Sequence, residues 1–442
     1  MNPARRIGVV SVVAIVLVTA AYVIGSRQNS GEPVHARLRF VSLAWQERAL
    51  AVNRAIVAEW NAAHPEMPVE YVQGTWNSVH DYLITSFETG DVPDVFHYES
   101  SVIIDFAMRG FLTDLGPMID AEMKDDILDV AWASVRQPDG SVAGVPFLME
   151  SLIGLYNADY MSRAGIVSPT LNDPWSWDDL RDAAKRMTLD TSGDGTIDRW
   201  GAAIGLRNCA NIMMNLSIGF GGSFFRKEND RYVVRVGDEE RKLLTTIYDM
   251  IHKDRSTSPT SIGQSGPAMI PGFFQGKYAM MVGIGAWSRQ QLVENAPKGF
   301  HWGVIPPILA KTQEAGTSAQ TLSIPVASKR KSEAMAFIRF MLSRENMARL
   351  AQSDWMLPAR RSCLETPEFR DPATGWDITT ASAKFLTTGT WMGAPGYVEW
   401  KSRVANPVFQ EYFSGRLSID EVAVRIEEES NTVLGRYQER AR

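Results

Sequence analysis

The segment DTSGDGTID, Asp190 to Asp198, has the residue types and spacing of a calcium-binding loop. An EF-hand loop supplies oxygen ligands at alternating positions, with a glycine at the sixth position and a bidentate glutamate at the twelfth. The matching oxygens here belong to Asp190, Ser192, Asp194, Thr196 (through its carbonyl) and Asp198. The twelfth position is Gly201, so the bidentate carboxylate is missing. The pattern predicts a weak calcium site that braces the fold, and a metal-free turn is the alternative.

Motifs for catalysis are scarce in the rest of the sequence. The histidines are scattered and form no HExxH motif, there is no GxSxG segment, and GFFQGK lacks the spacing of a phosphate loop. A carboxylate pair such as Glu99 and Glu150 would serve a glycosidase if the two groups faced each other across a sugar bond. We therefore expect a binding protein that is not an enzyme, with glycoside hydrolysis as the rival interpretation.

Composition limits the class of partner. The 442 residues are 45% hydrophobic and 22% charged, which is typical of globular chains. The net charge is -6, so the chain lacks the basic surface that nucleic acid requires. The 13 tryptophans suggest flat surfaces for stacking, although many such rings pack in cores.

The N-terminus is typical of an export signal. Arg5 and Arg6 precede an uncharged apolar run from Ile7 to Gly25, and a polar stretch follows. The run is also long enough to span a bilayer, with the arginines on the cytoplasmic side. We expect residues 1–35 to be a cleaved signal or a retained membrane anchor plus linker, and the rest of the chain to be extracytoplasmic.

Only two cysteines are present, Cys209 and Cys363, and neither is near the N-terminal segment. A lipid anchor on an N-terminal cysteine is therefore excluded by the sequence. The two cysteines either form one disulfide or serve as small buried apolar residues, and the sequence does not decide between these alternatives.

The next part of the chain alternates strands and helices. Strand patterns in 36–45, 67–74 and 92–100 alternate with helical patterns in 46–65, 78–90 and 103–115. This order predicts a mostly parallel sheet with helices on its faces, which binds ligands beyond the carboxyl ends of its strands. Aromatic and polar side chains gather at those ends: Trp45, Gln46, Trp76, Asn77, Tyr98 and Glu99.

A second group of elements follows. Residues 152–157 and 302–308 have strand patterns, and FFQGKYAMMVGIGAW has a turn that leads into a strand. Ser176 with Asp179, and Ser418 with Glu421, predict capping boxes at the starts of two helices. Helical patterns also cover 332–352. No internal repeat is visible.

Several of these segments together resemble a known family. FETGDVPDVFHY, GVPFLMESLIGLYNADYMSRAGI, PWSWDDLRDAAKRMT, DTSGDGTIDRWG, FFQGKYAMMVGIGAW and SKRKSEAMAFIRFMLSRENMARL occur in this order between residues 87 and 350. They resemble the sugar-binding solute-binding proteins of bacterial ABC importers, the family that includes maltose-binding protein. The resemblance implies an α/β fold of the bilobal, type II periplasmic-binding-protein class, with hinge segments that cross between lobes. We assign 36–146 and 308–355 to one lobe, and 147–307 and 356–442 to the other.

Further candidate ligand-binding residues come from the resemblance and from local sequence. Glu150 lies where the family's chain crosses between lobes, and Gln320 matches a loop on the ligand side. Trp287 follows a flexible Gly-Ile-Gly segment, Trp391 lies in a glycine-rich loop, and Arg360 is a further candidate. Aromatic rings can stack on the C–H face of a sugar, while amides, carboxylates and guanidinium groups bind its hydroxyls.

The function that follows is ligand binding without chemistry. We expect a sugar or oligosaccharide to be held between the lobes and delivered to the transmembrane subunits of an ABC permease, with no cofactor required. A membrane-tethered ligand sensor and a binding protein for glycerol phosphate or another polyol are the alternatives. Many relatives carry a lipid-anchored cysteine, which this chain lacks, so the mode of tethering stays open.

Overall fold

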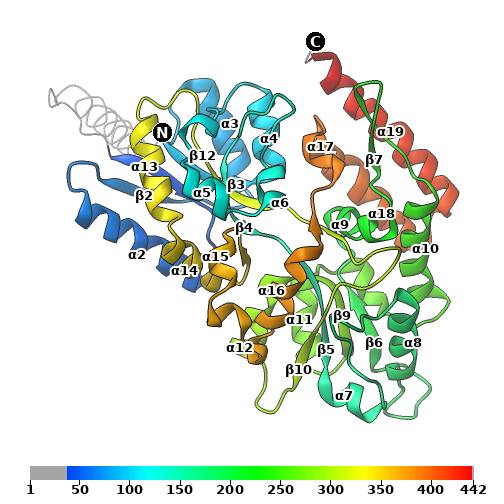
Figure 1. Ribbon diagram of the computed structural model, residues 1–442. Coiled ribbons are helices and arrows are strands. Elements are labelled where there is room, and N and C mark those ends of the chain that lie inside the picture. The colour runs from blue at the N-terminus through cyan, green and yellow to red at the C-terminus, as the bar shows by residue number, and fades with distance from the viewer. Residues whose placement is uncertain (1–36, 441–442) are drawn as a thin grey trace, which may run out of the picture. The chain divides into compact units, whose positions relative to one another are not determined.

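The first lobe begins with the predicted alternation of strands and helices (Figure 1). The computed structural model describes residues 37–440, so the expected export signal or anchor lies outside the described residues. The elements, in chain order, are β1 (Leu38–Ser42), α2 (Glu47–Ala63), β2 (Val69–Gln73), α3 (Val79–Thr89), β3 (Val95–Glu99) and α4 (Ser100–Met108). Strand β1 pairs in parallel with both β2 and β3, so the carboxyl ends of these strands lie at one edge of the sheet.

The complete sheet of this lobe has the order β13-β4-β12-β3-β1-β2 and is mixed. The added strands are β4 (Val145–Met149), β12 (Ala319–Ser323) and β13 (Leu357–Pro358). Strand β12 is antiparallel to β3 and β4, and β13 is antiparallel to β4. The prediction of a mostly parallel sheet is therefore correct for β1, β2 and β3 and wrong for the rest, because β12 enters the sheet from the second lobe rather than through a helical crossover.

Helices cover the first sheet and complete its core. They are α5 (Ala121–Asp126), α6 (Asp129–Ala133), α13 (Lys331–Met341), α14 (Arg344–Asp354) and α15 (Arg361–Leu364). Phe337 of α13 packs against Phe40 of β1 and Trp60 of α2, with ring centroids 5.4 and 5.6 Å apart. These aromatic contacts fasten α2 and α13 to the sheet that carries the predicted binding residues.

The second lobe is built on a four-stranded sheet with the order β10-β5-β9-β6. Its strands are β5 (Leu152–Asn157), β6 (Trp200–Ile204), β9 (Tyr278–Gly285) and β10 (Trp302–Ile305). The helices of this lobe are α7 (Ala158–Arg163), α8 (Trp177–Met187), α9 (Ala210–Phe220), α10 (Asp238–His252), α11 (Gly266–Phe274), α12 (Arg289–Asn295), α17 (Tyr397–Trp400) and α18 (Asn406–Phe413). Helix α16 (Trp376–Ala381) contacts both lobes, since Trp376 packs in the core of the first lobe and Ile378 packs against the core beside the second sheet. The predicted capping box of α8 is confirmed: Ser176 accepts from the Asp179 N–H, and Asp179 accepts from the Ser176 N–H.

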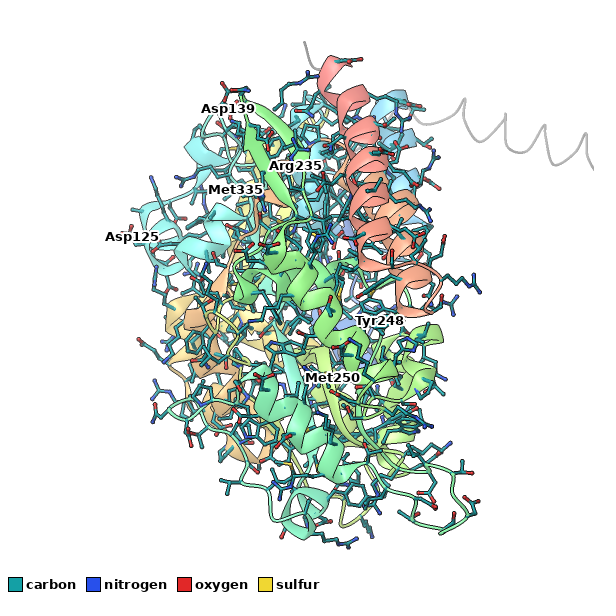
Figure 2. All side chains as sticks on the ribbon, turned by 90° about the vertical axis from the view of Figure 1, so that its right-hand side faces the viewer. Asp125, Asp139, Arg235, Tyr248, Met250 and Met335 are labelled. Atoms are coloured by element: carbon teal, nitrogen blue, oxygen red, sulfur yellow. The ribbon has the colours of Figure 1, made fainter. Side chains whose placement is uncertain are left out.

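The C-terminal helix α19 (Ile419–Arg440) covers the edge of a hairpin formed by β7 (Phe225–Glu228) and β8 (Arg231–Val234). Three alternate N–H groups along this edge, those of Tyr232, Val234 and Val236, donate to Gln438, Asn431 and Glu427 of the helix at 2.8–2.9 Å. Arg235 lies where the hairpin meets α19 (Figure 2) and comes within 3.8 Å of Glu427. The helix thus satisfies a strand edge that would otherwise be free to pair with another chain.

Three segments that cross between the lobes are hydrogen-bonded side by side. The first links β4 to β5 through Glu150, the second links β10 to β12 and contains Thr317, and the third follows Thr387. Thr317 is buried, its Oγ1 donates to the Glu150 carbonyl at 2.6 Å, and its N–H donates to the Thr387 carbonyl at 2.9 Å. The Glu150 N–H donates to Ser318 at 2.9 Å. Short strands β11 (Ala315–Gly316) and β14 (Leu386–Thr387) pair beside them.

The exact lobe boundaries stay a prediction, since the chain from Leu38 onward forms one compact unit. One difference from the predicted division is visible. Buried side chains between Leu357 and Leu386, including Cys363, Phe369 and Trp376, pack in the core of the first lobe rather than the second. Their short helical pieces carry no sequence pattern that would indicate which core they join.

The remaining sequence-based alternatives concern cysteine pairing and the membrane. Cys209 and Cys363 are both buried and unpaired, in the cores of different lobes. The disulfide alternative is therefore wrong, and both residues act as small apolar side chains. From residue 37 to residue 440, no helix is long and apolar enough to cross a membrane.

Close packing of α8 on β6 gives a first testable prediction. A Cβ atom on Gly201 would lie 1.8 Å from the carbonyl oxygen of Ala184, which is backbone and cannot move freely. We expect Gly201→Ala to lower the free energy of unfolding by about 3 kcal/mol or more in urea denaturation. The control is Gly263→Ala, because Gly263 faces open space. Its effect should stay within about 0.5 kcal/mol, and equal stabilities of the two variants would contradict this packing.

Candidate functional site

A cavity of about 290 Å³ is lined by residues from both lobes. Glu99 and Ser101 reach it from the carboxyl end of β3 and the start of α4. The three crossing segments supply Glu150, Ser318 and Trp391, so the same hydrogen-bonded crossings that join the lobes also form a wall of the cavity. The second lobe lines the other side of the cavity with residues that include Arg207, Asn208, Asn211, Ile212, Asn215, Ser265, Trp287 and Tyr397.

One face of α9 and the turn before it carries a row of amide side chains into the cavity. Asn208, Asn211 and Asn215 are spaced three and four residues apart, which places them on one helical face. The Tyr397 hydroxyl donates to the Asn211 Oδ1 at 3.2 Å and orients that amide. Amides both donate and accept, so this face suits a ligand with hydroxyl groups. Sequence reasoning missed these residues, although the spacing in RNCANIMMN could have indicated them.

The charge in the cavity is concentrated in carboxylates. Glu99 pairs with Lys401 at 3.5 Å, whereas no ion pair or hydrogen bond of the Glu150 carboxylate is found among the described residues. Burial raises the pKa of Glu150 to about 7, and the nearby Glu99 charge adds to the increase. Burial also raises the pKa of Asp354, which lies behind this wall, to about 7. Both carboxyl groups therefore exchange protons near neutral pH.

Four of the predicted ligand-binding residues line this cavity: Glu99, Glu150, Trp287 and Trp391. Two more, Trp45 and Trp76, lie outside it with 53% and 37% of their surface exposed. Trp45 contacts Trp287 edge-on, with ring centroids 5.7 Å apart. The structure thus brings together residues that are far apart in the sequence, and their contact with a ligand stays a prediction.

The other predicted residues at the strand ends do not line the cavity. Asn77 is exposed, whereas Tyr98 and Gln46 are buried, and Gln46 donates to the carbonyl of Asp354 at 3.2 Å. Gln320 is also buried, and its Oε1 lies 2.8 Å from the Nε2 of His97. The His97 Nδ1 accepts from the Leu43 N–H, so Nε2 carries the proton and donates to Gln320. Burial lowers the pKa of His97 to about 4, which keeps this bond in place at neutral pH.

Arg360 is buried away from the cavity and pairs with residues of the first lobe. Its guanidinium is buried and pairs with Glu122 at 2.6 Å and with Asp126 at 2.9 Å. Its Nε also donates to the Leu342 carbonyl at 2.9 Å. These three partners occupy the donors that a ligand would need, so Arg360 fastens α5 to the end of α13 instead of facing the ligand cavity.

The calcium-like loop is closed by its own hydrogen bonds. Asp190 accepts from the N–H groups of Gly193 and Gly195 at 2.7 Å, and Asp198 accepts from the Ser192 N–H at 3.0 Å. The Gly195 N–H is the main cause of the lowered pKa of Asp190, and the Thr191 hydroxyl, which donates to Asp198 at 2.6 Å, is the main cause of the lowered pKa of Asp198. The missing bidentate glutamate has no room, because any side chain at Gly201 would meet the Ala184 carbonyl. No group of three acidic, histidine or cysteine side chains in residues 37–440 is placed to hold a metal, and the calcium site stays a prediction.

A larger hollow of about 720 Å³ lies on the other side of the third crossing segment. Met392 lines both spaces. The larger one is bordered by exposed charged side chains such as Lys124, Asp125 and Arg136, and Asp125 projects outward from the surface (Figure 2). We take the smaller cavity as the candidate ligand site, because it combines tryptophans, amides and a buried carboxyl.

Comparison with known proteins identifies the family. Residues 45–348 match the family model described as bacterial extracellular solute-binding protein. This match covers more than half of the chain, so the protein belongs to the bacterial extracellular solute-binding protein family. The members of this family bind solutes for transport, and its fold is the bilobal α/β fold that the sequence predicts.

Relatives and solved structures agree with this assignment. An uncharacterized lipoprotein encoded in the oleD 5′ region of Streptomyces antibioticus is 42% identical over 388 residues, which are 87% of this chain and 84% of the relative. The diacetylchitobiose-binding protein DasA of Streptomyces coelicolor is 23% identical over 309 residues, 68% of each chain. The GacH receptor of Streptomyces glaucescens, solved unliganded and with acarbose, matches with a TM-score of 0.74 and 23% identity over 91% of this chain and 99% of the receptor. Maltose-bound MalE3 of T. maritima matches with a TM-score of 0.75 and 18% identity, over 90% of this chain and 99% of MalE3.

The raised pKa of Glu150 gives a prediction about stability. The folded state binds a proton at Glu150 more tightly than the unfolded state, so stability falls as the pH rises from about 4.5 through 7. Glu150→Gln removes this loss. We expect the variant to gain on the order of 1–3 kcal/mol over the wild type at pH 8 and almost nothing at pH 4.5, measured by urea denaturation at both pH values.

The matched control is Glu88→Gln, which changes an exposed glutamate of the same lobe. Its effect on stability should be equal at the two pH values. A gain for Glu150→Gln that does not depend on pH would show that the Glu150 carboxyl is not desolvated in the cavity wall.

Proposed function

We propose that this protein is the extracytoplasmic substrate-binding component of an ABC importer and holds a sugar or oligosaccharide in the cavity between its lobes. One observation carries the proposal: both lobes and all three crossings contribute tryptophan, amide, carboxyl or hydroxyl side chains to one cavity. The tryptophans suit the apolar face of a sugar, and the amides and carboxyls suit its hydroxyl groups.

The charge of the cavity favours a neutral ligand over a phosphorylated one. Among the described residues that line it, Arg207 is the single guanidinium or lysine group, against Glu99 and Glu150. A phosphate group would attract more cationic partners than this and would be repelled by the two carboxyls. Glycerol phosphate is therefore a weaker candidate than an uncharged sugar.

The names of several relatives support the same ligand class. DasA is named for diacetylchitobiose, GacH was solved with acarbose, and MalE3 was solved with maltose. All three ligands contain linked sugar rings or sugar-like rings. We infer that this chain binds a ligand of the same general class, without assigning it any one of them.

Binding itself, without bond cleavage, is the activity that we propose. A ligand that contacts both lobes favours the arrangement in which the lobes are closed on it. The three crossings, joined through Thr317, are the segments about which such a motion would occur. The closed arrangement then presents a surface to the transmembrane subunits of the permease.

We further propose that the protein acts at the outer face of the cell membrane. The apolar run from Ile7 to Gly25 supports a membrane segment or an export signal, and the Streptomyces antibioticus relative is named a lipoprotein. This chain has no cysteine near its N-terminus to carry a lipid. The apolar run is proposed to act either as a cleaved export signal or as a retained membrane anchor.

A thermal-shift screen against maltose, maltotriose, diacetylchitobiose, sugar phosphates and calcium tests this function. A ligand present at about 100 times its Kd should add about 2.7 kcal/mol to the stability of the native state. We expect a shift with one neutral sugar class, and Asn215→Ala should weaken the binding about tenfold, because a donor and an acceptor are lost.

The control variant is Asn295→Ala, because Asn295 is exposed on α12 and its amide donates to Gln291 of the same helix. It should bind like the wild type. Equal affinity of the wild type and Asn215→Ala for a sugar that binds would contradict the placement of the site, and a shift with calcium alone would contradict the sugar-binding proposal.

A further inference from the structure

Arg289 carries a positive charge into the interior of the protein without a carboxylate partner. Its side chain is fully buried, and no ion pair of its guanidinium is found in residues 37–440. Burial lowers the pKa of Arg289 to about 9, against the opposing effect of Asp377, so the group stays charged at neutral pH. Because a buried charge without a countercharge lowers stability, stability alone does not explain the presence of this side chain.

The guanidinium of Arg289 joins parts of the chain that belong to different lobes. Arg289 begins α12, which follows β9 of the second sheet. Its two terminal nitrogens donate to the carbonyls of Thr374 and Trp355, both at 3.3 Å. Its Cζ also lies 4.0 Å from the ring centroid of Trp376. Since Trp355 and Trp376 pack in the core of the first lobe, Arg289 links the lobes through a side chain, in addition to the three crossings of the backbone.

Within its own lobe, Arg289 holds the Trp287 turn, the short 3-10 helix Ala286–Ser288. Its Nε donates to the Ala286 carbonyl at 3.0 Å. The Ala286 N–H donates to the Ser151 carbonyl at 2.8 Å, next to Glu150 of the first crossing. Trp287 lines the cavity and packs against the core of the first lobe, although it follows a strand of the second. Arg289 thus holds a turn that forms part of the cavity wall.

The first-lobe partner of Arg289 has a strained backbone. Trp355 has a φ of 57°, in the left-handed region that is rare for a residue of this size. Its indole Nε1 is buried and has no hydrogen-bond partner in the described part of the chain. Trp355 ends α14, and its carbonyl is one of those that Arg289 binds. A bulky residue keeps such a conformation where surrounding contacts impose it, and strain of this kind gathers at functional sites.

We propose that Arg289 is a positioning residue of the ligand site, which ties the Trp287 turn to the first lobe and thereby sets one wall of the cavity. Arg289 itself is buried and does not line the cavity, so it acts on the ligand only through this wall. A guanidinium suits this task, because its planar fork donates in several fixed directions, whereas a lysine ammonium is a point charge on a flexible stem. This inference rests on the proposed sugar-binding function.

Titration calorimetry of the full chain with maltotriose and with diacetylchitobiose tests the inference. Arg289→Lys keeps the charge and removes the fork, and we expect it to weaken the binding of the probe that binds the wild type about tenfold. Trp287→Ala should weaken the binding at least about tenfold. Because Arg289 acts through Trp287, the variant with both changes should bind within about twofold of Trp287→Ala alone.

Arg360→Lys is the matched control, because Arg360 is also buried and also donates to a carbonyl through its Nε, but its remaining partners lie in the first lobe. It should lower the stability and leave the Kd of the probe within about twofold. Trp376→Phe is a milder second variant that keeps the test open if Arg289→Lys does not fold. It leaves a smaller ring face against the guanidinium and should weaken the binding about threefold.

Hydrogen exchange of the ligand-free protein gives a measurement that needs no sugar. The amides of residues 286–289 should exchange at least about tenfold faster in Arg289→Lys than in the wild type, because the turn loses its tie to the first lobe. The amides of β6, in the same sheet as β9, should exchange as in the wild type. Arg360→Lys should leave the exchange of residues 286–289 unchanged.

Several results would overturn the inference. If the effects of Arg289→Lys and Trp287→Ala on the Kd add, or if Arg360→Lys weakens the binding equally, sugar binding stands and Arg289 only supports the fold. If the exchange of residues 286–289 is unchanged in Arg289→Lys, the Trp287 turn does not depend on Arg289. If neither probe binds the wild type, the proposed sugar-binding function fails, and the role of Arg289 in ligand affinity fails with it.

Discussion

The hydrogen bonds of Thr317 hold together the part of the molecule on which the site depends. One buried residue donates through its hydroxyl to the carbonyl of Glu150 and through its N–H to the carbonyl of Thr387. Three crossings that are far apart in the sequence are thereby fixed side by side. Since backbone groups in such a buried place must be paired, the crossings cannot be separated without a cost of about 1–3 kcal/mol per lost bond.

The position of the cavity follows from this arrangement. Residues at or next to the crossings lie where the two lobes meet, and several of them line the cavity. Glu150 and Trp391 therefore face the cavity although they lie in, or next to, buried segments. The raised pKa of Glu150 is the physical consequence: a carboxyl group is held in a desolvated wall without a partner, an arrangement that lowers stability and suits the binding of a hydroxyl-rich ligand.

The sequence predicted the order of elements in the first lobe, the capping box at Ser176 and the class of fold, because each depends on local patterns. It placed Glu150 at a crossing through the resemblance to a family and proposed Trp287 from the Gly-Ile-Gly segment before it, and both residues line the cavity. It could not predict that Gln320 is turned toward His97, or that Arg360 pairs with Glu122 and Asp126, since these contacts join residues more than 200 positions apart. The asparagines of α9 were missed because their helix reads as an apolar core helix, and only the fold shows which of its faces meets the cavity.

The most direct test is a crystal structure of the full chain with whichever sugar gives the largest thermal shift. The account predicts density for a sugar ring in the cavity, with hydrogen bonds to Asn211 or Asn215 from the second lobe and to Glu99 or Glu150 from the other wall. Density in the larger hollow beside Asp125, or a sugar that contacts one lobe alone, would contradict it.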